Sequence, residues 1–513
     1  MNLGVYLAVS PMLIVAVGGV LLMIAEAFSH RRESHPGEPG DERAHGPSSE
    51  LALGTAIAML AGAVMAAAVW MVGPDKLEGV KDLAPYLIVD RFTLFFSFLL
   101  CLGGALAALL AGGYLPEHKL DRGEFYPLLT FSTVGCIMLA SAGDLLSLFL
   151  GLETMSLGVY ALTGFRRASP RSSEAAVKYF LLGSFAAALL LYGGALLYGA
   201  TGHTDLAGIR TAIAGGTALK GSNMALVGIA TVLVIAGLAF KVSAVPFHMW
   251  TPDAYEGAPT PATTYMAVAV KSAAFATLLR VLLGAFGDDT LTSWAAGWPP
   301  LVAVLAVLTM TVANFVAGRQ ESVKRMLAYS SIAHAGYILV GVVSTVHAGT
   351  DGQGSVLFYL LAYTVSTVGA FGTLILCGSR GAEAVSYEDL AGIGKRHPAA
   401  AMAFSLFLLS LAGVPPTAGF FGKLYIVRAS IGSGLYALSV LLLLNSVVGA
   451  YYYLRVLVYM YMREPAPGAP IARPMRSGYV ATALVVAAVL VVLLGLWPSM
   501  SLDIANQAAL AVR

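Results

Sequence analysis

The sequence predicts an all-α polytopic membrane protein with about fourteen transmembrane helices. Its 513 residues are 58% hydrophobic and only 11% charged, whereas a soluble globular chain would carry roughly a quarter charged residues. Apolar windows of about 20 residues, the length that a helix needs to cross the hydrocarbon core of a bilayer, recur along the whole chain. Polar tracts rich in turn residues, such as residues 287–290, 349–354 and 465–474, separate these windows.

The first window, residues 3–28, is expected to remain as a membrane span. Residues 1–28 lack a basic n-region and are longer than the apolar core of a signal peptide. The later spans are expected at residues 51–72, 91–113, 125–142, 145–164, 174–200, 222–247, 260–284, 299–317, 322–347, 354–378, 399–430, 434–461 and 477–498.

Prolines interrupt the seventh and the twelfth span in similar ways. Lys241 precedes Pro246 near the end of the seventh span, and Pro415–Pro416 lie within the twelfth. A proline removes a backbone hydrogen bond, and hydrocarbon tolerates this only where protein or water satisfies the freed carbonyl. Matching interruptions in two halves of a chain indicate an inverted repeat around a transport path. We therefore expect two inverted five-helix repeats, helices 4–8 and helices 9–13, each with a broken helix (helix 7 and helix 12).

These repeats divide the chain into four parts. Residues 1–120 are expected to form an N-terminal three-helix segment, 121–285 the first repeat, 286–462 the second repeat, and 463–513 a C-terminal loop with the last helix. A polar insert at residues 29–50 interrupts the first part, and its Pro, Gly and charge content cannot bury enough apolar area to fold alone. A solvated loop explains its three histidines better than a metal site does.

Basic residues lie mostly in the loops that follow odd-numbered spans. Cytoplasmic loops of membrane proteins carry an excess of Lys and Arg. These loops, including the polar insert, are therefore expected in the cytoplasm, and both termini on the opposite side. The basic residues form no run, which argues against nucleic-acid binding.

Three cysteines, Cys101, Cys136 and Cys377, lie singly within apolar segments. Because they show no paired spacing, they exclude an iron–sulfur or zinc framework within this chain, and packing is their expected role. The sequence also contains neither a Walker A motif nor a dinucleotide fingerprint after a strand. Any redox chemistry or ATP hydrolysis would therefore belong to a partner.

Ionisable side chains interrupt six of the apolar stretches. They are Glu153, Lys178, Lys241, Lys271, His334 and Lys423. A charge at bilayer depth costs about 3 kcal/mol or more, so a row of such groups predicts a path for protons or ions. Lysine suits such a path because burial makes it exchange its proton readily, and histidine exchanges protons near neutral pH.

Some of these residues also have a purely structural explanation. Glu153 lies roughly 12 Å of helix rise from the start of its helix and could be a protonated, hydrogen-bonded group that stabilises packing. Lys178 follows a basic loop closely enough for its stem to reach the cytoplasmic interface. His334 could be a hydrogen-bonded core residue. Asp144 is better explained as a helix N-cap.

Glu153 and Lys241 are candidates for a pair that starts a proton step. A carboxylate within about 4 Å of an ammonium contributes roughly 4 kcal/mol at an effective dielectric near 20. We hypothesise that Glu153 holds Lys241 charged when it approaches. Its withdrawal would then release the proton deeper along the chain, towards Lys271.

Five segments resemble one known family. They are GLETMSLGVYALTGF from Gly151, EAAVKYFLLGS from Glu174, FKVSAVPFHMWTPDAYEGAPTP from Phe240, KRMLAYSSIAHAGYILVG from Lys324 and LAGVPPTAGFFGKLYIV from Leu411. They are similar to the antiporter-like subunits of proton-pumping NADH–quinone oxidoreductase (respiratory complex I). Among these the sequence most resembles the subunit N group, the homologues of mitochondrial subunit 2. The resemblance extends from about the third span to the fourteenth.

The resemblance implies a role for each ionisable group. In the family a glutamate on helix five pairs with a lysine on helix seven, and a lysine on helix eight, a histidine on helix ten and a charged residue on helix twelve complete the path. These roles fall on Glu153, Lys241, Lys271, His334 and Lys423, with Lys178 as an additional lysine on helix six. The lysine on helix twelve distinguishes this sequence from subunit M, which has a similar pattern but carries glutamate at that position. The chain ends at Arg513, without the long lateral helix of subunit L.

The resemblance further implies that the chain passes protons within a larger redox enzyme and holds no cofactor of its own. NAD, FMN, iron–sulfur clusters and quinone would lie in or between other subunits, with membrane subunits on both flanks, in the plasma (inner) membrane of a bacterium. Two alternatives stay open: a subunit of a multisubunit Na⁺(K⁺)/H⁺ antiporter, and a structural scaffold whose lysines only anchor helices. The antiporter has less support because most of the buried groups are cationic and repel a metal cation.

Overall fold

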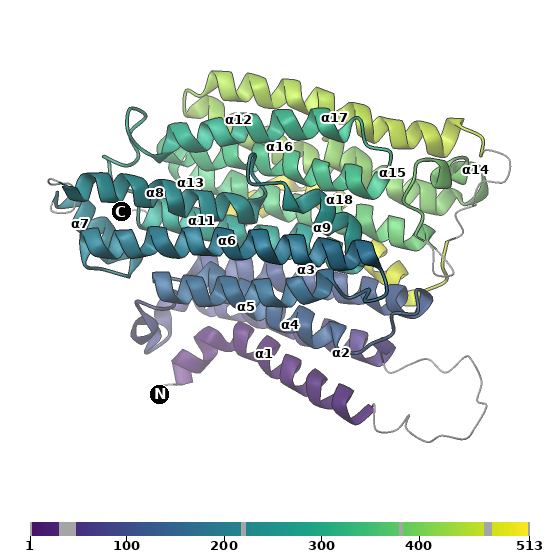
Figure 1. Ribbon diagram of the computed structural model, residues 1–513, viewed down its shortest axis with the longest axis horizontal. Helices are drawn as coiled ribbons and strands as arrows, with labels where there is room; N and C mark the ends of the chain where they lie inside the picture. The colour runs from purple at the N-terminus through teal and green to yellow at the C-terminus, as the bar shows by residue number, and fades with distance from the viewer. Residues whose placement is uncertain (1–2, 30–47, 217–221, 379–382, 466–473, 511–513) are drawn as a thin grey trace.

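Long helices run side by side through the whole protein, and both ends of the chain lie at the same end of the helices (Figure 1). The computed structural model describes residues 3–29, 48–216, 222–378, 383–465 and 474–510. Within these residues regular structure is helical, and pairing between extended segments is confined to isolated bridges. The fold is therefore all-α, as the apolar windows predict.

The first half of the chain contains eleven α-helices among its described residues. They are α1 (Leu3–Ser29), α2 (Ser48–Val72), α3 (Arg91–Glu117), α4 (Phe125–Ser141), α5 (Leu145–Thr163), α6 (Pro170–Thr201), α7 (Leu206–Ala214), α8 (Ser222–Val242), α9 (Trp250–Gly257), α10 (Thr260–Tyr265) and α11 (Lys271–Gly284). A π-helical turn, Met266–Val270, joins α10 to α11, so that these form one continuous rod.

The second half continues with helices of similar length. They are α12 (Trp298–Ala317), α13 (Val323–Cys377), α14 (Ile393–Arg396), α15 (Pro398–Ala412), α16 (Ala418–Gly432), α17 (Tyr436–Met462), α18 (Gly478–Leu496) and α19 (Pro498–Gln507). Short 3₁₀ turns at Pro74–Lys76, Val80–Leu83 and Glu388–Leu390 lie in the connections. The short helices α7, α9, α14 and α19 were not expected from the apolar windows.

Side chains cap several of these helices. The carboxylate of Asp144 accepts a hydrogen bond from the backbone N–H of Leu146 at 2.7 Å, which confirms its expected role as an N-cap. Asp90 caps α3 and Ser322 caps α13 in the same way. These caps fix the helix starts on both ends of the bundle.

The polar tract at residues 349–354 is predicted to separate two spans, and the helix is interrupted within this tract, by a single residue rather than by a loop. These residues lie within α13, whose backbone departs from helical geometry at Gly349 (φ 52°, ψ −122°). Only glycine adopts such dihedral angles without steric cost. A single residue therefore redirects the chain between the two expected spans 322–347 and 354–378.

The polar insert at residues 29–50 is shorter than expected at both ends. Ser29 is the last residue of α1, and Ser48–Glu50 form the first residues of α2. The rest of the insert, with its three histidines, lies outside the described residues, as does most of the tract at 465–474.

The two proline-containing interruptions are present. The first separates α8 from α9, and the second separates α15 from α16. Protein side chains satisfy carbonyls at both: Trp250 Nε1 donates to Phe240 O at 3.0 Å, and Lys423 Nζ donates to Ala412 O at 2.7 Å. Hydrocarbon could not supply these donors, so the interruptions depend on burial within the protein.

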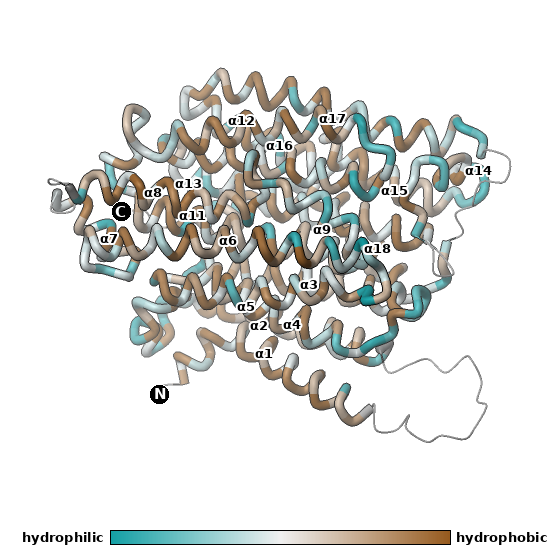
Figure 2. The backbone as a smooth tube through the Cα atoms, in the orientation of Figure 1, coloured by the Kyte–Doolittle hydropathy of each residue, from teal (hydrophilic) through white to brown (hydrophobic). Residues whose placement is uncertain are grey.

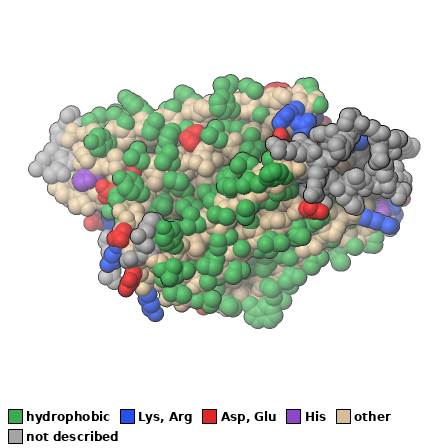
Figure 3. Space-filling view, turned by 90° about the horizontal axis from the view of Figure 1, so that it is seen from below, with side chains coloured by type: hydrophobic (Ala, Val, Ile, Leu, Met, Phe, Trp, Pro, Cys, Tyr) green, Lys and Arg blue, Asp and Glu red, His purple; other side chains and the backbone are tan. Residues whose placement is uncertain are grey.

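Eleven helices among the described residues are long and apolar enough to cross a membrane, counting α13 once, and α4 and α15 are shorter apolar helices. Hydrophobic residues occupy the middle of the helices and hydrophilic residues gather towards their ends (Figure 2). On the face seen from the side of α1, hydrophobic side chains cover most of the middle and most charged side chains lie near the two ends (Figure 3). This arrangement is typical of a polytopic membrane protein.

The centre of the bundle is formed by α10–α11 and α13. Within an apolar 18-residue window of each segment, all residues are buried in Thr260–Gly284 and 89% in α13, against 28% in α1. Small residues allow other helices to pack closely around this centre: a Cβ on Gly135 of α4 would lie 2.3 Å from the backbone nitrogen of Met155 on α5. The buried ionisable side chains Lys271 on α11 and His334 on α13 therefore have no direct route to lipid.

Candidate functional site

Lys241 lies at the end of α8, just before the first interruption, and is 2% exposed. Its ammonium donates to Ser156 Oγ at 2.7 Å and to the hydroxyl of Tyr160 at 3.4 Å, both on α5. The rings of Tyr160, Phe240 and Tyr179 lie within 5.5–6.0 Å of Nζ. Hydroxyls and aromatic faces therefore stabilise the charged form of this lysine.

Glu153 lies on α5, one turn before Ser156, and its Oε1 is a buried atom without a hydrogen-bond partner. The hypothesis of a Glu153–Lys241 contact pair is not met in this conformation, because no ion pair within 4 Å joins them among the described residues. The carboxylate is nevertheless close enough for its charge to act on Lys241. An unpartnered buried oxygen beside a lysine held by hydroxyls is an arrangement that could close into contact.

Lys271 is the first residue of α11, directly after the π-helical turn, and is 2% exposed. Its ammonium donates to the carbonyl oxygen of Ser331 on α13 at 2.6 Å and also to the Ser331 hydroxyl. Tyr363 donates to the same hydroxyl at 2.8 Å. No carboxylate lies within ion-pair distance of this lysine in the described part of the chain, so its charge is stabilised by neutral oxygen atoms and by the ring of Tyr363, 5.8 Å away.

His334 on α13 is held by two tyrosine hydroxyls. Its Nδ1 lies 2.6 Å from Tyr359 OH and its Nε2 lies 3.0 Å from Tyr453 OH. Both Lys271 and Lys423 act electrostatically on the ring. The hydroxyls can donate to the neutral imidazole or accept from the charged one, so both forms can be hydrogen-bonded.

Lys423 lies on α16, after the second interruption, and is 8% exposed. Its ammonium donates to Ala412 O at 2.7 Å and to Ser446 Oγ at 2.8 Å, and the ring of Tyr337 lies 5.3 Å away. Lys423 and Lys241 thus occupy related places, each beside an interrupted helix and held by hydroxyl or carbonyl oxygens.

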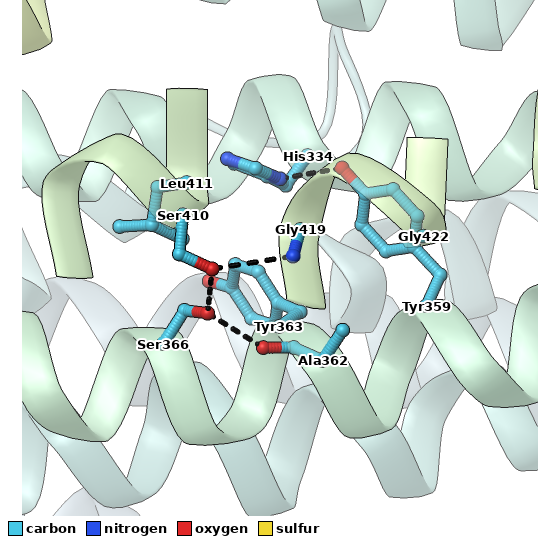
Figure 4. A pocket seen from close by; sticks show the side chains of 9 residues that line it. All are labelled: His334, Tyr359, Ala362, Tyr363, Ser366, Ser410, Leu411, Gly419 and Gly422. Carbon is cyan, nitrogen blue, oxygen red and sulfur yellow. Dashed lines mark hydrogen bonds between the residues drawn. The ribbon is translucent and has the colours of Figure 1, made fainter. Parts of the chain in front are cut away.

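A small cavity of about 10 Å³ lies between His334 and the second interruption (Figure 4). Tyr359 and Tyr363 line it, together with the hydrogen-bonded pair Ser366 and Ser410, whose hydroxyl oxygens are 2.8 Å apart. This volume is about that of one water-sized probe, and tyrosine and serine side chains are among the residues that line it. The cavity therefore has the size and polarity to hold a single water beside the histidine.

Lys178 is separate from the buried groups. Its side chain is 46% exposed and forms ion pairs with Glu174 Oε1 at 2.7 Å and Asp253 Oδ2 at 2.9 Å. Arg325 also pairs with Asp253, at 3.0 Å, around a cavity of about 290 Å³. Burial would raise the pKa of the Asp253 carboxyl, but the hydrogen bonds and charges of Lys178 and Arg325 outweigh it and lower that pKa. Of the two sequence-based interpretations of Lys178, the structure favours a water-exposed head group.

A second group of buried charges was missed from the sequence. Glu383, in the connection after α13, contacts Arg166, Lys324, Thr260 and Tyr114. In the sequence, Arg166 and Lys324 stand out only as basic loop residues that indicate orientation. The available sequence signal was a group of three acids, Glu383, Glu388 and Asp389, in a connection on the side of the protein where basic residues predominate.

Comparisons with known proteins agree with one another. A family model described as "NADH:quinone oxidoreductase/Mrp antiporter, TM" matches residues 142–449. The chain is 79% identical over 514 residues to "NADH-quinone oxidoreductase subunit N 1" of Sorangium cellulosum (strain So ce56), covering 100% of both chains. It is 40% identical over 538 residues to "NADH-quinone oxidoreductase subunit N" of Myxococcus xanthus (strain DK1622), covering 99% of this chain and 98% of the relative.

Solved structures give the same result for the fold. A chain of "Respiratory complex I from Thermus thermophilus with bound Aureothin" is 34% identical with a TM-score of 0.76, covering 96% of this chain and 98% of that one. A chain of "Structure of Mrp complex from Dietzia sp. DQ12-45-1b" has a TM-score of 0.82 at 22% identity, covering 100% of this chain and 98% of that one. The second likeness concerns the fold alone.

Proposed function

Since the chain belongs to the NADH-quinone oxidoreductase subunit N family, we propose that it is a proton-translocating subunit of the membrane arm of that enzyme. The resemblance found in the sequence motifs is confirmed by the full-length relatives. Electron transfer from NADH to quinone in other subunits drives the movement of protons through this chain. The chain takes part in the enzyme as a translocase subunit.

The observation that carries this proposal is the bonding of the buried lysines. Lys241, Lys271 and Lys423 are at most 8% exposed, and each is held by hydroxyl, carbonyl or aromatic groups at hydrogen-bond or cation–π distance rather than by a carboxylate. A lysine locked in a buried ion pair keeps its proton, whereas one held by neutral oxygens can lose it. These lysines therefore suit proton transfer better than helix anchoring.

The path runs through the bundle from Glu153 and Lys241 to Lys271, His334 and Lys423. Glu153 modulates the charge on Lys241, and Ser331 joins Lys271 to α13, which carries His334. The water-sized cavity beside His334 supplies a place for a bridging water. Lys178 belongs to the path only at its water-exposed edge.

The same proposal includes the finer organisation of the fold. The chain makes about fourteen membrane spans when the two parts of α13 are counted separately, with inverted repeats at 121–285 and 286–462. Residues 1–120 and 463–513 flank them. Support comes from the matching interruptions after α8 and α15, each with a buried lysine beside the break, Lys241 before the first and Lys423 after the second.

The partners and location follow from the family. Membrane subunits of complex I lie on both flanks, and NAD, FMN, iron–sulfur clusters and quinone are held in or between other subunits. Within the described residues no group of three or more His, Cys, Asp or Glu side chains could hold a metal ion. The protein lies in the plasma (inner) membrane of a bacterium, and the excess of basic residues in alternate loops supports placing both termini on the outer side.

The alternative of a Na⁺(K⁺)/H⁺ antiporter subunit has weaker support. The Mrp likeness is 22% in sequence identity, against 79% for the subunit N relative over the full length. Three of the buried groups on the path are lysines, whose ammonium groups occupy the oxygen ligands that an alkali cation would need.

The test uses the assembled enzyme in closed vesicles, with NADH oxidation and proton uptake measured together. Lys241→Met and Lys271→Met are expected to lower the number of protons moved per electron while leaving assembly and NADH oxidation by an artificial acceptor intact. Lys395→Met, whose side chain is 76% exposed, is the matched control. An unchanged proton-to-electron ratio in both Lys241→Met and Lys271→Met would overturn the proposal and favour a structural scaffold.

A further inference from the structure

Glu383 gathers side chains from four other segments of the chain. Its carboxylate accepts a hydrogen bond from Thr260 Oγ1 at 2.6 Å and one from Tyr114 OH, and it forms ion pairs with Arg166 at 3.0 Å and Lys324 at 3.3 Å. We name these five residues the Glu383 clamp. They come from the ends of α3 and α5, the starts of α10 and α13, and the connection after α13.

The clamp is a buried ionic group with one acid and two bases. The side chain of Glu383 is 15% exposed and that of Lys324 is 1% exposed. Burial would raise the pKa of the Glu383 carboxyl, but the charges of Lys324 and Arg166 and the hydrogen bonds from Thr260 and Tyr114 outweigh it and lower the pKa to about 2. The carboxylate is therefore ionised throughout the working pH range.

The clamp joins the start of α10 to the start of α13. Thr260 is the first residue of α10, and Lys324 Nζ also donates to Ala258 O, two residues earlier, at 2.8 Å. The connection that carries Glu383 is itself fixed, because Val323 N donates to Val385 O at 2.6 Å. Removing the carboxylate would release both helix starts from a common partner.

The same two helices meet again where Lys271 donates to Ser331. At about 1.5 Å of rise per residue, Lys271 lies roughly 16 Å along the helical rod from Thr260, and Ser331 lies roughly 10 Å along α13 from Lys324. Two rods joined at two levels have a fixed register. The clamp therefore determines where Lys271 lies relative to Ser331 and to His334 on the next turn.

We propose that Glu383 is a positioning residue for proton transfer, which fixes the register of α10–α11 against α13 so that Lys271 reaches Ser331. This inference rests on the proposed function, because it requires that Lys271 carries protons. Glu383 does not itself lie in the proton path. Its negative charge is needed because, without it, the positive charges of Arg166 and Lys324 are left unbalanced, and the starts of α10 and α13 lose their shared partner and keep only direct contacts such as the hydrogen bond from Lys324 Nζ to Ala258 O.

The primary test compares Glu383→Gln with Glu388→Gln in the assembled enzyme in closed vesicles. Glu388 lies in the same connection but is exposed, so the same chemical change removes no clamp contact. Glu383→Gln is expected to lower proton translocation roughly ten- to a hundred-fold through misplacement of Lys271, with NADH oxidation and assembly unchanged. Glu383→Asp, which keeps the charge, is expected to restore most of the translocation.

A second pair of variants avoids leaving buried charges unpaired. Thr260→Val removes one hydroxyl donor to Glu383, whereas Thr264→Val removes a hydroxyl that bonds only within its own helix. Thr260→Val is expected to lower the proton-to-electron ratio and Thr264→Val to leave it unchanged. This pair decides the question if Glu383→Gln does not assemble.

Lys271→Met in the same vesicles separates the two proposals. If Lys271→Met fails to translocate protons while Glu383→Gln translocates normally, the positioning role is overturned and the proposed function stands. If Lys271→Met translocates normally, the proposed function itself fails. An equal effect of Thr260→Val and Thr264→Val, or a parallel loss of assembly and translocation that Glu383→Asp does not restore, would also overturn the positioning role.

Discussion

Replacing Tyr359 by phenylalanine tests whether His334 relays protons. The tyrosine hydroxyl lies 2.6 Å from His334 Nδ1, and both side chains are buried. The substitution deletes one oxygen atom and keeps the ring, so the packing of Tyr359 against its neighbours is preserved. Nδ1 then faces the phenylalanine edge without a partner, in a region where the adjoining cavity has room for about one water.

The expected size of the effect follows from the cost of an unsatisfied buried group. Leaving a buried donor or acceptor unpaired costs about 1–3 kcal/mol. If the cost falls on the protonated imidazole, translocation slows by roughly five- to 150-fold, at about 1.4 kcal/mol per factor of ten. The cost is greater for the protonated ring, whose charged Nδ1–H loses its acceptor, than for the neutral ring, whose Nδ1 loses only a donor, so the substitution raises the free energy of the protonated relay state.

The assay measures proton uptake and NADH oxidation in closed vesicles that contain the assembled enzyme. Tyr425→Phe is the control, because Tyr425 packs against Phe358 and Phe421 and its hydroxyl makes no contact with His334. Tyr359→Phe is expected to slow proton translocation while Tyr425→Phe does not. A Tyr359→Phe enzyme that assembles and translocates protons at the wild-type rate would refute the relay role of His334.

Three further predictions follow from charged groups elsewhere. Lys178→Ala removes ion pairs that solvent screens, so it should slow translocation far less than Lys271→Met does in the same vesicles; a loss as large as that of Lys271→Met would contradict this. Asp90→Asn leaves the buried guanidinium of Arg280 without the carboxylate that lies 3.0 Å from it. It should lower the free energy of unfolding by about 2–3 kcal/mol, less than for a fully buried pair. The measurement is the Tm in detergent, which should fall; an unchanged Tm would contradict the prediction. The pKa of Glu383 is lowered from 4.5 to about 2 by folding, so its stabilisation is complete above about pH 4.5 and is lost as the pH falls towards 2; the Tm difference between wild type and Glu383→Gln should therefore narrow over that range, and a constant difference would refute the linkage.

Burial of the central groups could be predicted from the sequence. A lysine near the middle of a long apolar window cannot reach water by extending its stem, and Lys271 is 2% exposed. Lys178 lies near a helix start, where exposure depends on which face of α6 meets its neighbours. Sequence periodicity does not determine that face, and the side chain proved to be 46% exposed.

Contacts between distant segments could not be predicted from the sequence. Whether Glu153 touches Lys241 depends on the relative rotation of α5 and α8. The sequence pattern is the same whether the two side chains form an ion pair or lie beyond ion-pair distance, so it cannot distinguish these cases. Glu383 and Tyr114 meet only because the connection after α13 packs against the end of α3. The sequence predicts an interruption at residues 349–354 but does not show that one residue with positive φ, Gly349, makes it.

Because the π-helical turn at Met266–Val270 directly precedes Lys271, the direction of the Lys271 side chain depends on how many residues the turn contains as well as on which residues they are. An aliphatic residue exchanged for another within this turn leaves every later side chain facing the same way. Omitting one residue rotates all of α11 by roughly 100° and turns Lys271 away from Ser331. Variation in length at this point is therefore far more disruptive than variation in composition, although the turn itself carries only Met, Ala and Val.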